Sequence, residues 1–325
     1  MNKIGKNIFL ILITILITQS LFAQQGWEVN RAKGTGDLIS VFFTSSNEGW
    51  VAGDNGYLAF TNDGGRSWNK KILNTAANIN EIYFRNNDNG YLIAGRKMFI
   101  TKDGGKSWRE EIIVNPDEFK DGIPEFLSIR FNNKKQGFII GSVIAKDNSD
   151  RVIGSLLLKT EDGGDTWTRI DVPSQVELFH LDFDGKSHGW IVGDLGTILN
   201  SSDNGNTWIV QNSGTKETLY NVDFWDEKEG FAVGWNGTVL RTEDGGNKWI
   251  KVKSFVENTL FRVDFADDKN GWIVGSDGLI LRSYDRGKIW VKQDSQTLNS
   301  LYGLFMDKKY GWSVGKDGVI IRYEK

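Results

Sequence analysis

Six aspartates that stand in nearly the same local sequence are the residues most clearly placed to do chemistry. Each belongs to a stretch such as TEDGGNKW (242–249), in which a Gly follows closely and a Trp lies five residues after the Asp. Loop carboxylates can bind Ca²⁺, but this ion takes roughly six to eight oxygen ligands and each copy supplies one carboxylate. An Asp side chain also accepts backbone hydrogen bonds within a turn, where Gly takes the positive φ. We therefore expect structural turns that hold no metal.

The Trp of each copy begins a strand and is expected to fold back against the sheet that carries it. Burial of such a ring removes roughly 150–250 Å² from water, which favours a stapling role. The structural residues assigned to these Asp turns are Asp63, Trp68, Asp103, Trp108, Asp162, Trp167, Asp203, Trp208, Asp244, Trp249, Asp285 and Trp290.

Few other residues have the types or spacing that catalysis needs. The chain contains no Cys and two His, His180 and His188, which form no metal-ligand pattern in the sequence. Asp182, Asp223 and Asp264 could supply the two carboxylates of a glycoside hydrolase, but they recur in step with the repeat and so favour a structural role. We expect a protein that is not an enzyme and that holds no cofactor and no metal.

The elements that position these residues follow from an internal repeat. The Asp residues of successive copies lie 40, 59, 41, 41 and 41 residues apart, and a second motif, GWIVG at 271–275 and its variants, recurs in phase in seven copies. Within 219–253, alternating apolar and polar residues predict four strands. Their expected bounds are 219–224, 230–234, 238–242 and 248–252. Four strands in a unit of about 41 residues are typical of a β-propeller blade.

The two ends of the chain together supply one more unit. The last copy of the second motif continues into KDGVIIRYEK (316–325) and ends before any Trp, whereas QGWEVN (25–30) places Trp27 ahead of the first full unit. We predict an all-β, seven-bladed β-propeller with four-stranded antiparallel blades, closed by pairing of the N-terminal strand into the last blade. A solenoid would show the same period but would not need Trp27 to complete a truncated unit.

The first 23 residues differ from the rest. Two lysines precede a short apolar run at 8–17, and the segment ends on a small residue, which is typical of a secretory signal peptide. An uncleaved anchor is the alternative, although the run is short for a bilayer. We expect residues 1–23 to be the signal peptide, 24–325 to be the propeller, and the mature protein to be secreted or periplasmic. The net charge of −3 argues against a general nucleic-acid binder.

The repeat resembles a known sequence motif and a known protein family. The pattern S/T-x-D-x-G-x-x-W is similar to the Asp-box, or BNR repeat, and the fuller unit GW-x-VG-x-x-G-x-x-L-x-T-x-D-G-G-x-x-W resembles the Ycf48/Hcf136 family of photosystem II stability and assembly factors. The resemblance covers 24–325. It implies a seven-bladed propeller without enzymatic activity, which binds a newly made membrane-protein subunit through an Arg-rich patch.

In this chain, the arginines that could correspond to this Arg-rich patch lie on the third strand of the blades. Arg241, Arg282 and Arg322 occupy the equivalent position in three consecutive copies. The four preceding copies carry Phe60, Ile100, Lys159 and Asn200 there, so the Arg column is partial. Asp-box propellers also include sialidases, and the alternative function is therefore a carbohydrate-binding or glycoside-hydrolase propeller.

The loops of a propeller alternate between two faces of the ring. One face, here called the insertion face, carries the loops that join an outer strand to the next inner strand and a second strand to a third. The other face carries the Asp turns and is called the Asp-turn face. The step of 59 residues, from Asp103 to Asp162, is longer than the others because the third unit, blade 3, has two extended loops. They lie at 113–126 and 142–155, and both are expected on the insertion face.

Long loops on a rigid scaffold often carry function, so we predict a partner-binding rim at blade 3. A disordered elaboration is the alternative. The residues assigned to the rim are Asp117, Glu118, Phe119, Lys120, Lys146, Asp147 and Arg151.

The inner strands supply the second candidate region. Two variable positions of these strands form columns. One holds Ser40, Glu81, Ser128, His180, Asn221, Arg262 and Gly303, and the other holds Phe42, Tyr83, Arg130, Asp182, Asp223, Asp264 and Phe305. Arg130, His180 and Arg262 are assigned as partner-binding candidates in the central channel. Mutual hydrogen bonding around the channel is the structural alternative and the one the pattern favours. Phe179, Tyr220, Phe261 and Tyr302 are expected to pack blade against blade.

These patterns together favour a non-catalytic propeller that binds a protein partner outside the cytoplasm, as an assembly or stability factor for an envelope or membrane complex. We expect a monomer that binds no nucleic acid, and a glycan is the less favoured ligand.

Overall fold

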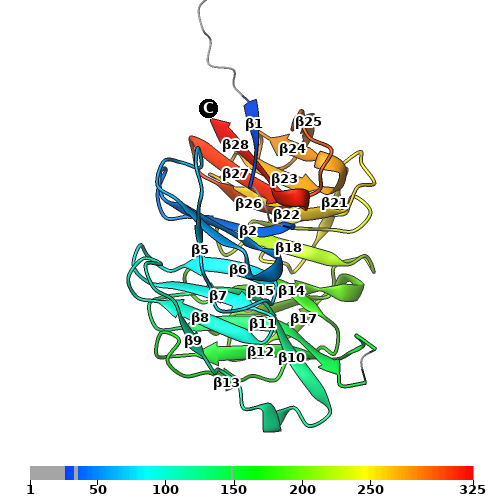
Figure 1. Cartoon of the computed structure of the whole chain (residues 1–325). Helices are drawn as coiled ribbons and strands as arrows, with labels where there is room; N and C mark the ends of the chain where they lie inside the picture. Colours follow the sequence, from blue (N-terminus) through cyan, green and yellow to red (C-terminus); the bar gives the residue numbers. More distant parts are fainter. Residues whose placement is uncertain (1–25, 33–35, 148, 325) are drawn as a thin grey trace, which may run out of the picture.

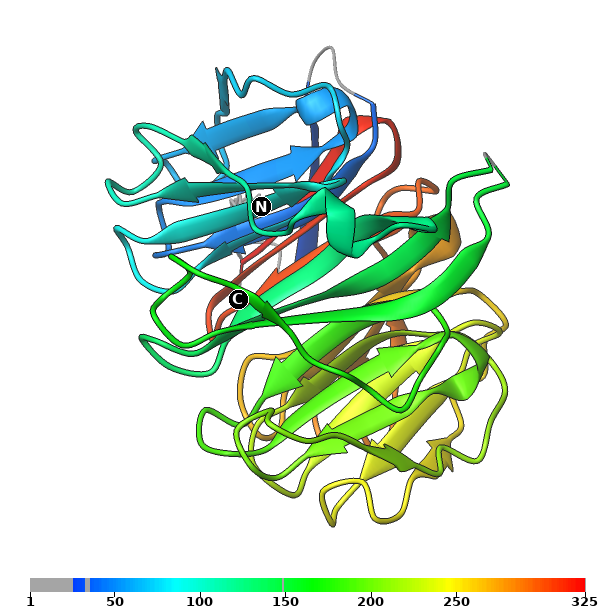
Figure 2. The same cartoon turned by 90° about the horizontal axis from the view of Figure 1, so that it is seen from below.

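The computed structural model describes residues 26–32, 36–147 and 149–324, so the predicted signal peptide lies outside the described residues. The described strands form seven sheets, each of four antiparallel strands, and Figure 1 shows how they follow one another through the molecule in sequence order. Figure 2 shows the same ring from below. The predicted seven-bladed propeller is confirmed. Among the described residues, no helix has the length and apolar character needed to span a membrane.

Each blade runs from an inner strand at the channel to an outer strand at the rim. Blade 1 comprises β2 (Leu38–Phe43), β3 (Gly49–Gly53), β4 (Leu58–Thr61) and β5 (Asn69–Lys71). Blade 2 comprises β6 (Ile79–Phe84), β7 (Gly90–Ala94), β8 (Lys97–Thr101) and β9 (Arg109–Glu111). Blade 3 comprises β10 (Gly122–Phe131), β11 (Gly137–Ala145), β12 (Val152–Thr160) and β13 (Thr168–Arg169).

The remaining blades follow the same order around the ring. Blade 4 comprises β14 (Leu178–Phe183), β15 (Gly189–Gly193), β16 (Ile198–Ser201) and β17 (Ile209–Gln211). Blade 5 comprises β18 (Leu219–Phe224), β19 (Gly230–Gly234), β20 (Val239–Thr242) and β21 (Ile250–Val252). Blade 6 comprises β22 (Leu260–Phe265), β23 (Gly271–Gly275), β24 (Ile280–Ser283) and β25 (Val291–Gln293). Blade 7 comprises β26 (Leu301–Met306), β27 (Tyr310–Gly315), β28 (Val319–Glu324) and β1 (Gly26–Arg31).

Short 3₁₀ turns join the second and third strands in most blades. They are η1 (Asp54–Gly56), η3 (Asp194–Gly196), η4 (Ser276–Gly278) and η5 (Lys316–Gly318), whereas η2 (Pro116–Glu118) precedes the inner strand of blade 3. In η1 the Gly56 φ is 67°, and an added Cβ would lie 2.2 Å from the Thr75 carbonyl oxygen of the next loop. Glycine is therefore required where this turn meets the neighbouring blade.

The inner strands carry a bulge that the sequence spacing reflects. In blade 1, the pairing of β2 with β3 shifts between Leu38 and Ser40. The bulge lets Leu38 and Val41, three residues apart, both point into the core, where a regular strand would send them to opposite faces. The second strands of blades 1, 2, 4, 5 and 6 are buried along their full length because they lie between two other strands and between two blades.

The ring closes as predicted, with β1 paired to β28. Trp27 stands opposite Tyr323 and Arg31 opposite Val319, and the Trp27 and Tyr323 ring centroids lie 5.4 Å apart. Figure 1 shows β1 lying beside β28 near the C-terminus. Trp27 also belongs to the same apolar cluster as Trp272 of blade 6. The N-terminal strand thus supplies both the outer edge of blade 7 and a contact to its neighbour.

Blade 3 differs from the loops predicted there. Much of 122–126 and 142–155 is strand, since β10, β11 and β12 pair from Gly122 with Ala145 to Gly137 with Thr160. These are the long green strands of Figure 2. The inserted residues therefore extend the blade as a paired sheet, because antiparallel pairing satisfies their backbone groups.

Candidate functional site

The Asp turns bind their own backbone. In blade 5, Asp244 Oδ1 accepts the Lys248 N–H at 2.9 Å and the Thr242 hydroxyl at 2.9 Å, while Thr242 Oγ1 accepts the Gly246 N–H at 2.8 Å. Equivalent bonds occur in the other five copies. The carboxylates are thus engaged within the turns, which supports the structural interpretation of the motif.

Hydrogen bonds to the carboxylate also set the charge of these turns. The hydroxyls of Ser67 and Ser107 donate to Asp63 and Asp103 and lower the pKa of each carboxyl to about 2. The Thr166 hydroxyl has the same effect on Asp162, whose pKa is also lowered to about 2. These three turns are therefore anionic at neutral pH.

The tryptophan of each turn packs on the inner strand of its own blade. Trp249 meets Phe224 edge to face at 5.8 Å, and Trp290 meets Phe265 in the same way at 5.8 Å. An aromatic residue of the preceding blade reaches the turn glycines as well, since Trp190 Nε1 donates to the Gly245 carbonyl at 3.0 Å. The Asp-turn face is therefore a scaffold that links neighbouring blades.

The Arg column assigned as a partner site is engaged within the propeller. Arg282 is buried, donates to the Tyr323 hydroxyl at 2.7 Å and lies 4.6 Å above the Trp272 ring. Arg241 pairs with Glu229 and Glu243. Arg322 pairs with Glu324 at 2.9 Å, and its side chain is 13% exposed. Each guanidinium already has a local partner, so this column does not form an open basic patch.

The channel candidates form one ion cluster. Glu81 accepts hydrogen bonds from Arg130 at 2.6 Å, from the Ser128 hydroxyl at 2.7 Å and from the Ile129 N–H at 2.8 Å. Arg130 donates to His180 Nε2 at 2.8 Å. Arg262 lies 4.0 Å from Glu81. Burial, together with Arg130 and Arg262, lowers the pKa of His180 well below its ordinary value, so the ring is neutral.

The channel aspartates tie each blade to the next. Asp182 accepts the Phe224 N–H at 2.8 Å, Asp223 accepts the Phe265 N–H at 3.1 Å, and Asp264 accepts the Met306 N–H at 2.7 Å. Burial raises the pKa of Asp182 to about 6 and that of Asp264 to about 7. Burial and the neighbouring carboxylates raise the pKa of Asp223 well above its ordinary value.

These bonds favour the structural interpretation of the inner columns. The channel is a polar chamber of about 230 Å³, and its aspartates hold backbone amides of the adjacent blade. On the inner strands of successive blades, Phe179 meets Tyr220 at 5.2 Å and Phe261 meets Tyr302 at 5.2 Å, which confirms their predicted packing between blades.

The blade 3 rim borders an apolar groove on the insertion face. The groove has a volume of about 680 Å³ and lies between the outer loop of blade 2 and the extended strands of blade 3. Its apolar lining includes Ile112, Ile113, Ile123, Pro124 and Ile144. Ile112 is 88% exposed. Pockets of this size and character are the usual places for a ligand.

Charged side chains of both signs surround this groove. Arg96 and Lys97 line it from blade 2, and Glu125, Lys146 and Asp150 line it from blade 3. Burial, with the Asp150 carboxylate nearby, raises the pKa of Glu125. An apolar centre with a mixed polar border is the usual composition of a protein–protein contact.

The rim residues take different positions around the groove. Lys146 lines the groove, and its Nζ donates to the Lys120 carbonyl at 2.8 Å. Asp117 and Glu118 are exposed in η2. Asp147 and Arg151 pair across the β11–β12 turn at 3.5 Å.

Phe119 is buried, with 4% of its surface exposed, in the apolar cluster of blade 3. Its ring is therefore not available to a partner. The apolar lining of the groove was missed in the sequence, although the run IIV at 112–114 beside a long insertion was a signal of it.

Comparisons with known proteins agree with this architecture. A family model described as Photosynthesis system II assembly factor YCF48 matches residues 67–177, 168–253, 208–298 and 259–324. A solved structure of YCF48 bound to D1 peptide is 20% identical to this chain, with a TM-score of 0.74 over 92% of this chain and 95% of that one. YCF48 from Cyanidioschyzon merolae is 19% identical, with a TM-score of 0.72 over 92% and 98%.

Propellers with other functions share the fold. The GH74 xyloglucanase from Xanthomonas campestris is 12% identical, with a TM-score of 0.68 over 92% of this chain and 54% of that one. No curated protein sequence matches the chain. At such identities, likeness to a solved structure shows the fold alone, whereas the family model covers most of the repeat region.

Proposed function

The chain belongs to the Photosynthesis system II assembly factor YCF48 family, and from this premise we propose that it is a non-catalytic propeller that binds an apolar segment of a client protein. The observation that carries the proposal is the groove beside blade 3, with Ile112 exposed at its edge. The family relative bound to D1 peptide supports the choice of a peptide as the occupant.

The expected setting is the envelope. The secretory signal predicted at 1–23 supports a protein that acts after export, in the periplasm or outside the cell. Its client would then be a subunit of an envelope or membrane complex, held by the propeller during assembly. Fractionation of cells that express the full chain tests this setting, and the exported protein is expected to begin at Gln24. A protein confined to the cytoplasm with its first residues intact would contradict it.

Site-specific crosslinking tests the groove. We would place a photo-crosslinking residue at Ile112 and, as a matched control, at Leu298, which is 86% exposed in the corresponding loop before blade 7. Crosslinked segments recovered from an envelope extract are identified by mass spectrometry. The proposal predicts one recurrent apolar segment at Ile112 that is absent at Leu298. The same segments at both positions would contradict it.

A charge placed in the groove gives an independent test. Ile112→Asp should weaken capture of that segment by at least about tenfold, because a buried carboxylate in an apolar contact has no partner. Leu298→Asp should leave capture unchanged. Because both side chains are exposed, neither variant should lower the melting temperature by more than a few degrees.

A carbohydrate ligand is the second candidate, favoured by the GH74 propellers that share the fold. Glycan arrays and chromogenic glycosides distinguish the two. The engagement of Asp182, Asp223 and Asp264 by backbone amides supports the absence of hydrolysis, since a glycosidase needs two carboxyl groups free to face substrate.

A further inference from the structure

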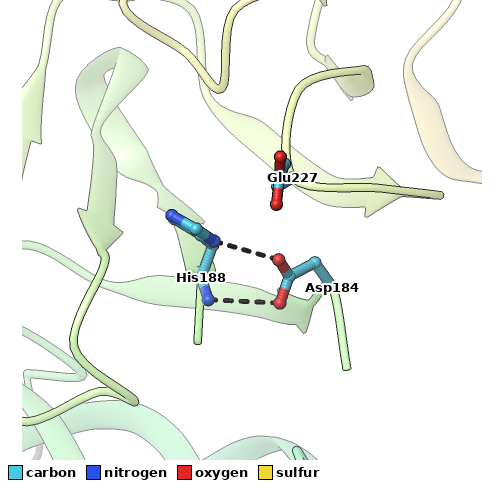
Figure 3. A group of neighbouring side chains, drawn as sticks. All are labelled: Asp184, His188 and Glu227. Carbon is cyan, nitrogen blue, oxygen red and sulfur yellow. Dashed lines mark hydrogen bonds and ion pairs between the residues drawn. The ribbon is translucent and has the colours of Figure 1, made fainter. Parts of the chain in front are cut away.

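Three side chains from two blades converge on the Asp-turn face, away from the groove. Asp184 and His188 lie in the turn between β14 and β15, and Glu227 lies in the matching turn of blade 5 (Figure 3). One ligand atom from each residue lies within 4.8 Å of the others. We propose that these residues bind a divalent first-row transition metal ion, with Zn²⁺ as the probe.

The Asp184 and His188 pair is already ordered. Asp184 Oδ1 accepts the Lys186 N–H at 2.8 Å and the His188 N–H at 3.1 Å, and its Oδ2 lies 3.0 Å from His188 Nδ1. The Asp184 side chain is 1% exposed. The His188 ring also stacks on Trp190 with centroids 6.2 Å apart. The two donor atoms are thus held 3.0 Å apart, a little closer than the roughly 3.3 Å between tetrahedral zinc ligands with bond lengths of about 2.0–2.1 Å.

The next pair of blades shows what such a cluster requires. Between blades 5 and 6, Glu229 and Asp268 occupy the turn positions that correspond to His188 and Glu227. There Arg286 binds Asp268 at 2.6 Å and Glu229 at 3.7 Å. At the interface of blades 5 and 6, the positive charge between the two carboxylates is therefore the guanidinium of Arg286, which belongs to the Asp turn of blade 6.

Between blades 4 and 5 the corresponding turn position is Gly245, which has no side chain. The described cation nearest to Glu227 is Lys186, 3.8 Å away, with a side chain that is 73% exposed. Two carboxylates therefore converge with an imidazole where the neighbouring interface places an arginine. One imidazole and two carboxylates are ligands that a divalent transition metal commonly takes, because the lone pair of the imidazole nitrogen and the carboxylate oxygens bind the ion directly.

The bound form requires small changes in the ligands. Neutral His188 would carry its proton on Nε2, which frees Nδ1 for the metal, and the ion would replace the contact between Nδ1 and Asp184. Glu227 would exchange its contact with Lys186 for the metal, and water would complete the coordination. The ion would link blades 4 and 5 as Arg286 links blades 5 and 6. This proposal departs from the expectation of no metal site drawn from the sequence, where the repeat separates Glu227 from His188.

Zinc titration of the chain purified without an affinity tag tests the site. Calorimetry should show one zinc ion bound, and zinc should raise the melting temperature. Glu227→Gln should weaken binding by more than about tenfold, since even residues outside the coordination shell change metal affinity by that much. Asp268→Asn, at the matching position where Arg286 already supplies the cation, should leave zinc affinity unchanged.

Copper gives a spectroscopic test of the histidine. The chain has two histidines and His180 is buried in the channel, so the electron paramagnetic resonance spectrum of bound Cu²⁺ should show one coordinated imidazole nitrogen. His188→Gln should remove that signature. No zinc binding in the parent protein, or equal zinc affinity in the parent and the Glu227→Gln variant, would overturn the site.

Discussion

Aspartate occupies two repeated positions in this propeller, and the two sets have opposite chemistry. The turn aspartates, such as Asp63 and Asp103, lie at the surface, accept hydroxyl and amide hydrogen bonds and have a pKa lowered to about 2. The channel aspartates, such as Asp182 and Asp264, are buried and have a pKa raised to about 6 and about 7. Both sets accept backbone N–H groups, so burial is what separates them.

The two sets also differ in what they hold together. The turn aspartates form an outer corner that stabilises each blade by itself, whereas the channel aspartates belong to an inner ring that joins one blade to the next. Asp244 closes a turn of its own blade, whereas Asp223 holds the amide of Phe265 in the next blade. We therefore expect removal of an inner polar group to affect the whole ring and removal of a turn carboxylate to affect one blade.

The largest expected effect is that of Glu81→Ala in the channel. It would leave the Arg130 guanidinium, the Ser128 hydroxyl and the Ile129 N–H without their shared acceptor. Loss of one partner of a buried ion pair lowers the free energy of unfolding by roughly 3–5 kcal/mol. Urea denaturation measures it.

The control for Glu81 is Glu110→Ala, which removes a surface pair with Lys97 and should change stability by less than about 1 kcal/mol. Similar losses of unfolding free energy in both variants would show that the polar groups of the inner ring stabilise the fold no more than a surface ion pair does.

The next effect is a gain in stability from Asp264→Asn, and it depends on pH. The folded pKa of about 7 exceeds the unfolded value of about 3.9, so the carboxyl destabilises the fold as pH rises from about 4 to 7 and above. An asparagine oxygen can still accept the Met306 N–H, as Asn221 accepts that of Val263 at 2.9 Å.

We expect Asp264→Asn to raise the free energy of unfolding by about 1–3 kcal/mol at pH 8 and to change it little at pH 4. Thermal melts at the two pH values measure the difference. A loss of stability at pH 8 would mean that the ionised carboxylate is favourable in the channel.

The repeated features were predictable from the sequence because they recur. Asp and Trp in a fixed frame predicted the turns, and Trp27 ahead of the first unit predicted the closure that its pairing with Tyr323 confirms. The engagement of Arg282 also had a signal, since its partner Tyr323 directly follows Arg322, the residue at the same position in the next blade. The three-residue spacing of Leu38 and Val41 likewise reflected the bulge of the inner strand.

The features that occur once were not predictable in the same way. The groove is lined by residues of two neighbouring blades, such as Ile112 and Ile144, and no periodic pattern marks such a pair. The sequence pattern predicted an exposed loop around Phe119, but the residue follows η2 and is buried in the core. His188 and Glu227 meet only because the turns of adjacent blades lie together.

A smaller effect is expected from Asp244→Ala at the outer corner. The change removes acceptors for the Lys248 N–H and the Thr242 hydroxyl, which lie where water can replace part of the loss. We expect the free energy of unfolding to fall by about 1–2 kcal/mol, as for the loss of a capping side chain. Capture of the client segment by the groove should be unchanged, and a large loss of capture in a folded variant would assign function to the Asp-turn face.

The smallest effect is that of Asp103→Asn, which is measured as a change in how stability depends on pH in acid. Because the folded pKa of about 2 lies below the unfolded value of about 3.9, the carboxylate contributes stability above about pH 4 and loses it as pH falls toward 2. Asparagine does not titrate, so the variant should lose stability less steeply than the parent between these values, by one proton in the slope of unfolding free energy against pH. Melts in steps from pH 5 to 2 measure both slopes. Equal slopes would mean that Asp103 titrates alike in the folded and unfolded chains, and the contrast between the outer and inner aspartates would then rest on the channel alone.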